Sequence, residues 1–217
     1  MARVDDYQLA CDMARKELAP KKPDLLAGYA GASFQRSDKG KTWFVLNFLG
    51  RNITVTWPDL FFTAGLPEKG LSLQEQVLLL HYLKGCWETR GESPSGEWAA
   101  FQDMPDGRFY LDAFQKRAKL PLLKAFGDQP DRLQTLAAQA YGAVPIDLGD
   151  AAVKVDALPI VPVVLILWKG DDEFPPEGSI LFDQNISKIF SAEDVAWLAG
   201  MVVYPLIGLS REMVSKQ

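Results

Sequence analysis

Residues 160–168 read Ile-Val-Pro-Val-Val-Leu-Ile-Leu-Trp, a nearly continuous apolar run that predicts a central strand buried on both faces. Residues 151–158, Ala-Ala-Val-Lys-Val-Asp-Ala-Leu, predict a strand before it, and Ser179–Phe182 predict a short strand after it. Pro159 and Pro162 make the start of the central strand irregular or edge-like, because proline cannot donate a hydrogen bond to a neighbouring strand.

A second β-rich region lies earlier in the chain. Thr42–Leu49 and Asn52–Trp57 are rich in aromatic and β-branched residues and stand two residues apart, so they predict a β-hairpin. We therefore predict an α+β fold, a single domain over residues 1–217. In it, one antiparallel sheet, built from the hairpin and the strands of 151–182, packs against several helices.

Local signals mark the helices in the middle of the chain. Ser72-Leu73-Gln74-Glu75 is a capping box, in which the serine and glutamate side chains satisfy backbone amides at the start of a helix. The mostly apolar helix that follows is expected over Leu73–Lys84, ending at Gly85. Phe109–Phe126 also has a helical pattern, but Pro121 is expected to split it into two helices.

The two ends of the chain are predicted to be helical as well. Asp5–Leu18 has apolar residues at helical spacing and stops before a proline-containing segment. Ser191-Ala192-Glu193-Asp194 is a second capping box. The uncharged run Val195–Ser210 is shorter than the roughly 20 apolar residues of a membrane-spanning helix, so we expect a buried helix that breaks near Pro205, and no membrane span.

Composition and charge narrow the class of protein. Of the 217 residues, 48% are hydrophobic and 24% charged, as in globular proteins. The net charge of −5 argues against general nucleic-acid binding, which needs a basic surface. Met1–Val144 contains 18 basic and 17 acidic residues, whereas Pro145–Gln217 contains 5 basic and 11 acidic ones. The negative charge therefore belongs to the last third of the chain.

Two further patterns predict the cellular compartment of the protein and the state of its two cysteines. The N-terminus lacks the basic start and uninterrupted apolar stretch of a secretory signal, so we expect a cytoplasmic protein. Cys11 and Cys86 have no CxxC partner, so this chain alone is not expected to hold a zinc ribbon or an iron–sulfur cluster. Both cysteines are expected to be reduced and buried.

Acidic residues concentrate after the predicted central strand. Asp171, Asp172 and Glu173 follow its end, and Asp183 ends the next strand, so antiparallel pairing is expected to bring Asp183 near the start of this turn. Mg²⁺ and Ca²⁺ prefer several oxygen ligands, which makes these four carboxylates a candidate metal site. The alternative is a solvated acidic turn, because charge clusters are usually exposed.

Two aromatic residues, Trp168 and Phe174, flank the acidic turn. Their rings are candidates for stacking on a planar ligand or a cation, and packing in the core is the alternative. With Asp172, Glu173 and Asp183 they form the candidate ligand-binding set of this segment.

His81 is the only histidine, so any chemistry that needs an imidazole must use it. Within an apolar helix, its expected state is neutral and hydrogen-bonded, in a structural role. The alternative is a ligand-binding role.

Short motifs lie along most of the chain, most clearly from Leu71 onward. They are Leu79-Leu80-His81-Tyr82-Leu83, Gly96-Glu97-Trp98 with Phe101, Asp106-Gly107-Arg108-Phe109-Tyr110, Leu167-Trp168-Lys169-Gly170-Asp171-Asp172-Glu173-Phe174-Pro175, Ile180-Leu181-Phe182-Asp183 and Glu193-Asp194. In these motifs the chain resembles the uncharacterised domain-of-unknown-function family 3786 of anaerobic bacteria and archaea. Some members carry an iron–sulfur module, which this chain lacks. The resemblance implies a redox- or corrinoid-associated context but no reaction and no catalytic residues.

Three functions are compatible with these patterns. The leading hypothesis is a non-catalytic accessory protein that binds a small molecule, a cofactor or a partner through the acidic turn. The partner would be an iron–sulfur or corrinoid protein of anaerobic metabolism. A second hypothesis is a divalent-metal-dependent enzyme that uses the same carboxylates as ligands and general base. The third, which the family resemblance implies, is binding of a corrinoid or haem with His81 as its axial ligand.

Overall fold

The structure is a computed structural model, and it describes residues 4–65 and 69–214. The chain divides into two compact units. The first unit contains the described residues up to Ser93 together with Leu158–Ile160 and Lys188–Phe190. The second unit contains Pro94–Ala157, Val161–Ser187 and the described residues from Ser191 onward.

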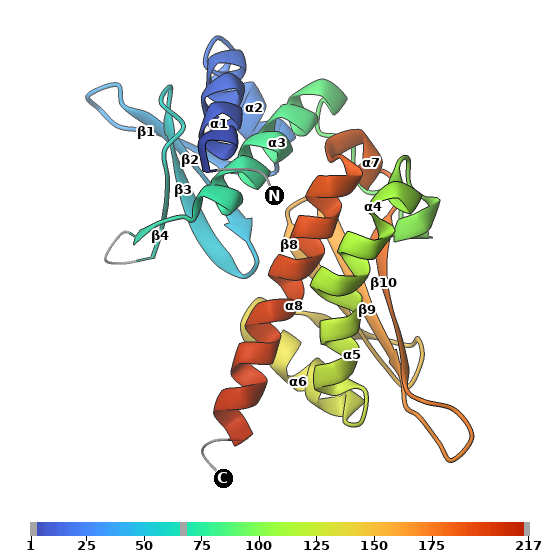
Figure 1. Cartoon of the computed structure of the whole chain (residues 1–217). Helices are drawn as coiled ribbons and strands as arrows, with labels where there is room; N and C mark the ends of the chain where they lie inside the picture. The colour runs from blue at the N-terminus through green and yellow to red at the C-terminus, as the bar shows by residue number, and fades with distance from the viewer. Residues whose placement is uncertain (1–3, 66–68, 215–217) are drawn as a thin grey trace. The chain divides into compact units, whose positions relative to one another are not determined.

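The first unit combines three helices with a five-stranded antiparallel sheet in the order β1-β2-β3-β4-β5 (Figure 1). Its elements are α1 (Val4–Leu18), α2 (Pro23–Tyr29), β1 (Ser33–Arg36), β2 (Thr42–Phe48), β3 (Arg51–Trp57), β4 (Phe62–Ala64), β5 (Lys69–Gly70) and α3 (Leu73–Thr89). Helices α1 and α2 both pack against α3. The predicted N-terminal helix is therefore confirmed.

The predicted hairpin is also confirmed, as the pair β2 and β3. The connecting residues Leu49 and Gly50 have φ angles of 50° and 71°, the left-handed conformation that a two-residue hairpin turn requires. In β2 the side chains of Phe44, Leu46 and Phe48 are buried, whereas the residues between them are more exposed. This alternation gives the sheet one apolar face.

Helix α3 begins at the predicted capping box but does not end where we expected. The Ser72 side chain accepts a hydrogen bond from the Glu75 amide, and Glu75 accepts one from the Ser72 amide. The predicted end at Gly85 is wrong, because the helix continues to Thr89. A Cβ atom at Gly85 would lie 2.5 Å from the carbonyl oxygen of Ile189. The glycine therefore permits close backbone packing and does not terminate the helix.

The second unit contains the other sheet, in the order β6-β10-β9-β8-β7, with helices in front of the strands in Figure 1. Its strands are β6 (Trp98–Ala100), β7 (Val144–Ile146), β8 (Ala151–Leu158), β9 (Val161–Trp168) and β10 (Glu177–Asp183). Its helices are α4 (Gly107–Phe114), α5 (Leu120–Phe126), α6 (Pro130–Tyr141), α7 (Ile186–Ile189) and α8 (Ala192–Val214), and a short 3-10 turn covers Phe101–Asp103. The last residue of β8 and the last two residues of α7 are counted with the first unit.

The predicted central strand is confirmed as β9, which lies between β8 and β10 and is buried from Val161 to Leu167. The α+β class is confirmed too. The prediction that the hairpin and the strands of 151–182 share one sheet is wrong, because they belong to two separate antiparallel sheets. Each group pairs with short strands of its own part of the chain. The single domain stays a prediction.

The segment from Gly107 to Phe126 confirms two α-helices with Pro121 in the first turn of the second one, but it shows no break between them. A π-helical segment, Gln115–Lys119, joins α4 directly to α5, so the helical backbone continues through the proline. Proline lacks the N–H of the regular ladder and its ring crowds the preceding turn. The wider π turn just before it accommodates both effects.

Helix α8 likewise runs from Ala192 to Val214 without the break that we expected at Pro205. Its predicted capping box is confirmed by reciprocal hydrogen bonds between Ser191 and Asp194. Near the proline, the Val202 carbonyl accepts a hydrogen bond of 2.7 Å from a tyrosine hydroxyl of α6. By length and composition, this helix is apolar enough to cross a membrane, and 56% of its apolar window is buried within the protein. The expected lack of a membrane span stays a prediction.

Candidate functional site

The acidic turn, residues 169–176 between β9 and β10, is organised by Asp171. Its Oδ1 accepts hydrogen bonds from the amides of Glu173 (2.9 Å) and Phe174 (2.8 Å), and its own amide donates to the Phe174 carbonyl (2.9 Å). The bonds from Phe174 and Glu173 lower the pKa of the Asp171 carboxyl below its ordinary value. The turn is thus shaped by its own backbone.

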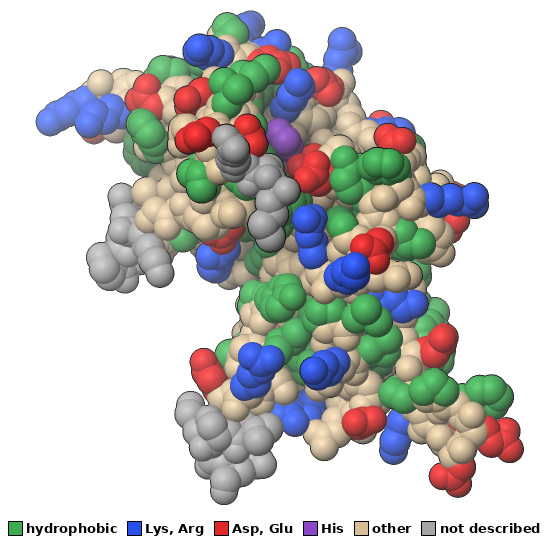
Figure 2. Space-filling view, in the orientation of Figure 1, with side chains coloured by type: hydrophobic (Ala, Val, Ile, Leu, Met, Phe, Trp, Pro, Cys, Tyr) green, Lys and Arg blue, Asp and Glu red, His purple; other side chains and the backbone are tan. Residues whose placement is uncertain are grey.

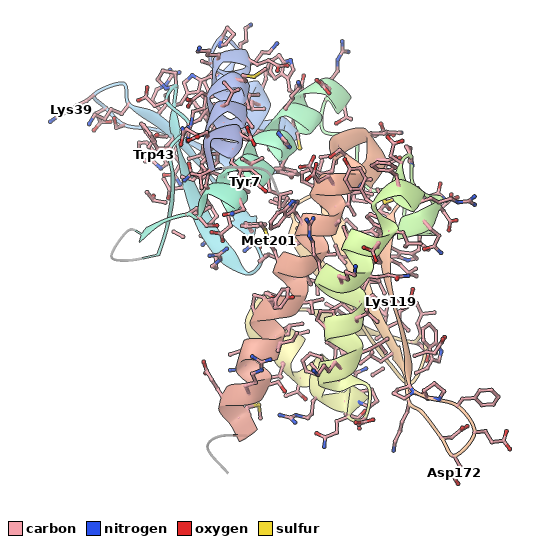
Figure 3. All side chains as sticks on the ribbon, viewed as in Figure 1. Tyr7, Lys39, Trp43, Lys119, Asp172 and Met201 are labelled. Carbon is pink, nitrogen blue, oxygen red and sulfur yellow. The ribbon has the colours of Figure 1, made fainter. Side chains whose placement is uncertain are left out.

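The two aromatic side chains beside the turn are exposed. Trp168 is 40% exposed and Phe174 67% exposed, so core packing does not account for them. Figure 3 shows Asp172 at the tip of the turn, and Figure 2 shows acidic and apolar side chains together there. The turn therefore presents both charge and apolar surface to solvent.

Asp183 does not lie near this turn, which corrects our expectation. Glu177 pairs with Trp168, and Phe182 pairs with Val163, so Asp183 ends β10 at its opposite end. Asp183 lies six positions after Glu177 in an extended strand, so about 20 Å separates the two residues. The error has a simple cause: a residue at the end of the second strand of a hairpin lies far from the connecting turn.

Asp183 instead anchors the segment before β6. Its side chain is 2% exposed, and it accepts hydrogen bonds from the amides of Ser95 (2.9 Å), Gly96 (2.7 Å) and Asn185 (2.9 Å) and from the Ser95 hydroxyl (3.1 Å). Burial opposes ionisation of Asp183, but these hydrogen bonds outweigh it and lower the pKa of the carboxyl. The carboxylate oxygens of Asp183 are therefore occupied by hydrogen bonds within the protein.

The candidate metal site is not assembled. Within residues 4–65 and 69–214, no group of three or more histidine, cysteine, aspartate or glutamate side chains is placed to hold a metal ion. Asp171, Asp172 and Glu173 share one exposed turn, while Asp183 lies at the other end of β10. The structure thus brings three of the four predicted ligands into one loop and separates the fourth.

His81 lies on α3, where it is half-buried. A cavity of about 880 Å³ in the first unit is lined by residues of β3, β4 and the start of α3, and His81 is not one of them. The buried positions of Cys11 and Cys86 are confirmed. Burial raises the pKa of the Cys86 thiol to about 12, although a hydrogen bond with Tyr82 opposes this effect.

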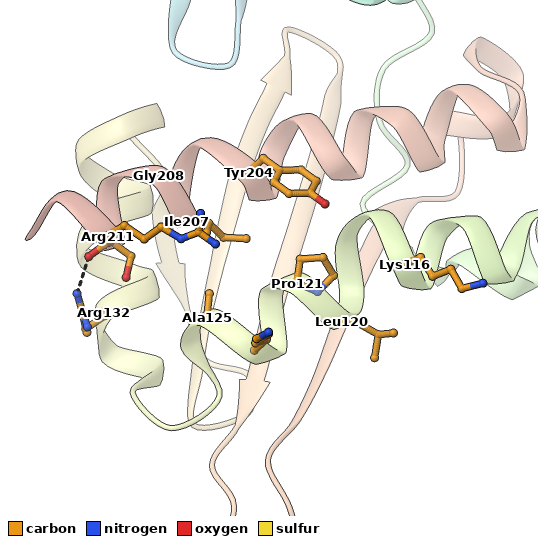
Figure 4. Close-up of a pocket in the computed structure, with 11 residues that line it drawn as sticks. Lys116, Leu120, Pro121, Ala125, Arg132, Tyr204, Ile207, Gly208 and Arg211 are labelled. Carbon is orange, nitrogen blue, oxygen red and sulfur yellow. Dashed lines mark hydrogen bonds between the residues drawn. The ribbon is translucent and has the colours of Figure 1, made fainter. Parts of the chain in front are cut away.

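A further cavity, which the sequence did not predict, lies in the second unit among the π segment, α5, α6 and α8 (Figure 4). Its volume is about 930 Å³, within the range of small-molecule sites. Leu120, Pro121, Tyr204 and Ile207 contribute apolar surface. Gly208 also lines the cavity, and a Cβ atom at this position would have no other atom within 4 Å.

Four basic side chains and no acidic ones line the same cavity: Lys116, Lys124, Arg132 and Arg211. Lys116 pairs with Asp112 at 2.8 Å, which offsets its charge. Arg132 donates to the Gln129 side chain (3.0 Å) and to the Ser210 carbonyl (3.1 Å), and both acceptors are neutral. In the described part of the chain, Lys124, Arg132 and Arg211 form no ion pair. Arg132 also lines a neighbouring pocket together with Asp128, Asp131 and Asp150. The cavity itself combines a basic lining with apolar surface.

Residues 22–204 match the family described as Domain of unknown function (DUF3786). The chain belongs to this family. No curated protein and no solved structure matches the chain. The DUF3786 match covers the whole acidic turn and the cavity residues up to Tyr204, whereas Ile207, Gly208 and Arg211 lie beyond its end.

The sequence does contain a signal for the cavity of this DUF3786 protein. Lys116, Leu120 and Lys124 recur every four residues, which places two cations and an apolar side chain on one side of a helix. Tyr204, Gly208 and Arg211 follow at i, i+4 and i+7 in the last helix. Neither set is dense in charge, so counting charged residues along the chain does not find them.

Proposed function

We propose that this protein is a non-catalytic binding protein that holds a small molecule in the cavity among α5, α6 and α8. The observation that carries the proposal is the cavity itself, with its volume of about 930 Å³, apolar side chains and a few convergent polar groups. Ligand sites in proteins combine these properties, because apolar contact supplies affinity and polar groups fix orientation.

Gly208 offers a direct test. Gly208 lines the cavity and a Cβ atom there would have no neighbouring atom within 4 Å, so Gly208→Leu is expected to fill the site and leave the fold intact. Gly28→Leu on α2 is the matched control, since a Cβ atom there would also meet nothing within 4 Å. Native mass spectrometry should find an adduct of a few hundred daltons on the wild type and the control only. The same adduct on all three proteins, or on none, contradicts the proposal.

A second candidate function, contact between the acidic turn and a basic partner, is supported by the exposure of Trp168 and Phe174. Aromatic residues are enriched where proteins associate, and acidic side chains guide a basic surface toward them. The double variant Asp172→Asn, Glu173→Gln should reduce partner capture in a pull-down. Lys154→Gln on β8 serves as a surface control. Unchanged capture by the double variant would remove this candidate.

We also propose the cellular setting that the resemblance implied, an accessory role in the cytoplasm of an anaerobe beside an iron–sulfur or corrinoid protein. Mass spectrometry of material that co-purifies anaerobically tests this setting. A corrinoid or haem bound through His81 predicts a visible absorption band that is lost in His81→Ala. The metal-dependent enzyme predicts a stoichiometric divalent metal in protein purified without chelator.

A further inference from the structure

Two of the arginines that line the cavity lie apart from most of its apolar side chains. Figure 4 shows Arg132 and Arg211 toward one end, Tyr204, Pro121 and Leu120 further along the same space, and Lys116 beyond them. Lys116 is paired with Asp112, so its charge is offset at that far end. The site therefore has a basic end and an apolar stretch. A ligand that matches both parts must itself have an anionic end and an apolar body.

At the basic end, Arg132 is held in place by its own hydrogen bonds. The guanidinium donates to the side chain of Gln129 and to the backbone carbonyl of Ser210. Because both acceptors are neutral, these hydrogen bonds do not neutralise the positive charge of Arg132, and Arg211 contributes a second guanidinium to the cavity lining. Guanidinium groups bind carboxylates through short, charge-assisted hydrogen bonds.

Along the apolar stretch, the side chains are open to solvent in the structure. Leu120 is 53% exposed and Tyr204 55% exposed, although both line the cavity. Covering such surface with a hydrocarbon chain removes it from water, which is favourable in proportion to the area covered.

We propose that the cavity binds a single-chain amphiphile with a carboxylate head, the head at Arg132 and Arg211 and the chain along Leu120, Pro121 and Tyr204. This inference rests on the proposed function and adds the chemical class of the ligand. Charge complementarity favours this occupant over a neutral one, because no acidic side chain lines the cavity.

Three probes separate the two parts of the inference in calorimetric titrations of the full chain. Decanoate has both the head and the chain, decanol lacks the charge, and butyrate lacks the long chain. We expect decanoate to bind at least about tenfold more tightly than either of the others. Arg211→Met should weaken decanoate binding about fivefold or more and leave decanol binding unchanged. Arg108→Met, an exposed arginine of α4 outside the cavity, is the matched control.

The results of these titrations distinguish a failure of the carboxylate head from a failure of the proposed function. Equal binding of decanoate and decanol, both lost in Gly208→Leu, would overturn the carboxylate head and leave the proposed function in place. If no probe binds and the wild type carries no adduct, the proposed function itself fails. If the chain self-associates and Asp172→Lys, Glu173→Lys disperses it while decanoate does not bind, a second copy's acidic turn occupies the cavity and the amphiphile is wrong.

Discussion

The acidic turn and the basic cavity lie in the same unit, carry opposite charge and differ in how their charge is used. In the turn, the Asp171 carboxylate is hydrogen-bonded to the two amides that follow it closely in the chain, so part of the charge shapes the loop. In the cavity, cations from four helical segments meet, and Lys124, Arg132 and Arg211 form no ion pair within the described residues. Charge that is dense along the sequence is thus partly used locally, whereas the cations of the cavity come together only through folding.

The largest effect that we expect separates two acids of the same segment. Asp183→Ala should lower the free energy of unfolding by about 2–4 kcal/mol, because it removes a buried carboxylate and leaves the amides of Ser95, Gly96 and Asn185 without their acceptor. Asp172→Ala at the exposed tip should leave the urea midpoint of the full chain unchanged. Equal urea midpoints for the two variants would contradict the conclusion that Asp183 stabilises the fold and Asp172 does not.

This effect has a defined pH dependence. Because the pKa of Asp183 is lower in the folded protein, its contribution is fully present above the unfolded value of about 3.9 and is lost as the pH falls through the folded value. Urea midpoints measured from pH 7 down to pH 3 should therefore fall less steeply in Asp183→Ala than in the wild type.

A smaller effect is expected on decanoate affinity when the charge is reversed in the basic cavity or in the acidic turn. Lys124→Glu introduces an acid into the basic cavity and should weaken decanoate binding about tenfold. Asp172→Lys makes the opposite change in the turn and should alter the same affinity less than about twofold, because exposed charges outside the site are screened. Equal effects in calorimetry would mean that overall charge, and not the cavity, governs binding.

A still smaller change concerns helix stability at the cavity. Gly208→Ala should stabilise the protein by about 0.5–1 kcal/mol, since alanine is the better helix former and the added methyl meets no atom within 4 Å. Differential scanning calorimetry measures the shift. A destabilised variant would show that the position is not an open helical site.

The smallest expected effect is local to the turn. Asp171→Ala removes the acceptor for the amides of Glu173 and Phe174, so these two amides should exchange with solvent faster. The cavity helices should keep their exchange rates. Hydrogen exchange with mass spectrometry tests both statements, and protection lost on α5 or α8 would contradict the independence of the two regions.

Local patterns predicted much of the fold. The β2–β3 hairpin, the central strand β9 and both capping boxes depend on residues that are neighbours in sequence, and all are confirmed. The division into two sheets was not predicted, because pairing between distant strands leaves no local pattern. We also predicted interruptions at Gly85, Pro121 and Pro205, but the helices continue through these residues. Tertiary contacts, which the sequence pattern does not show, account for this difference.

The candidate sites were less predictable than the fold. The composition of the acidic turn was evident, but its distance from Asp183 follows from strand register, which is fixed only once the pairs form. The cavity depends on how the π segment, α5, α6 and α8 pack. Its sequence signals were the helical spacings of Lys116, Leu120 and Lys124 and of Tyr204, Gly208 and Arg211, and such spacing becomes informative once neighbouring helices are known.

The division of the chain has a practical consequence for work with fragments. The backbone passes between the two units after Ser93 and again around Leu158–Ile160 and Lys188–Phe190, so neither unit is one continuous segment. A protease cut between Ser93 and Pro94 would leave those two short segments of the first unit on the C-terminal fragment. Expression of residues 1–93 alone would omit these two segments. The full chain is therefore the appropriate material for ligand-binding studies.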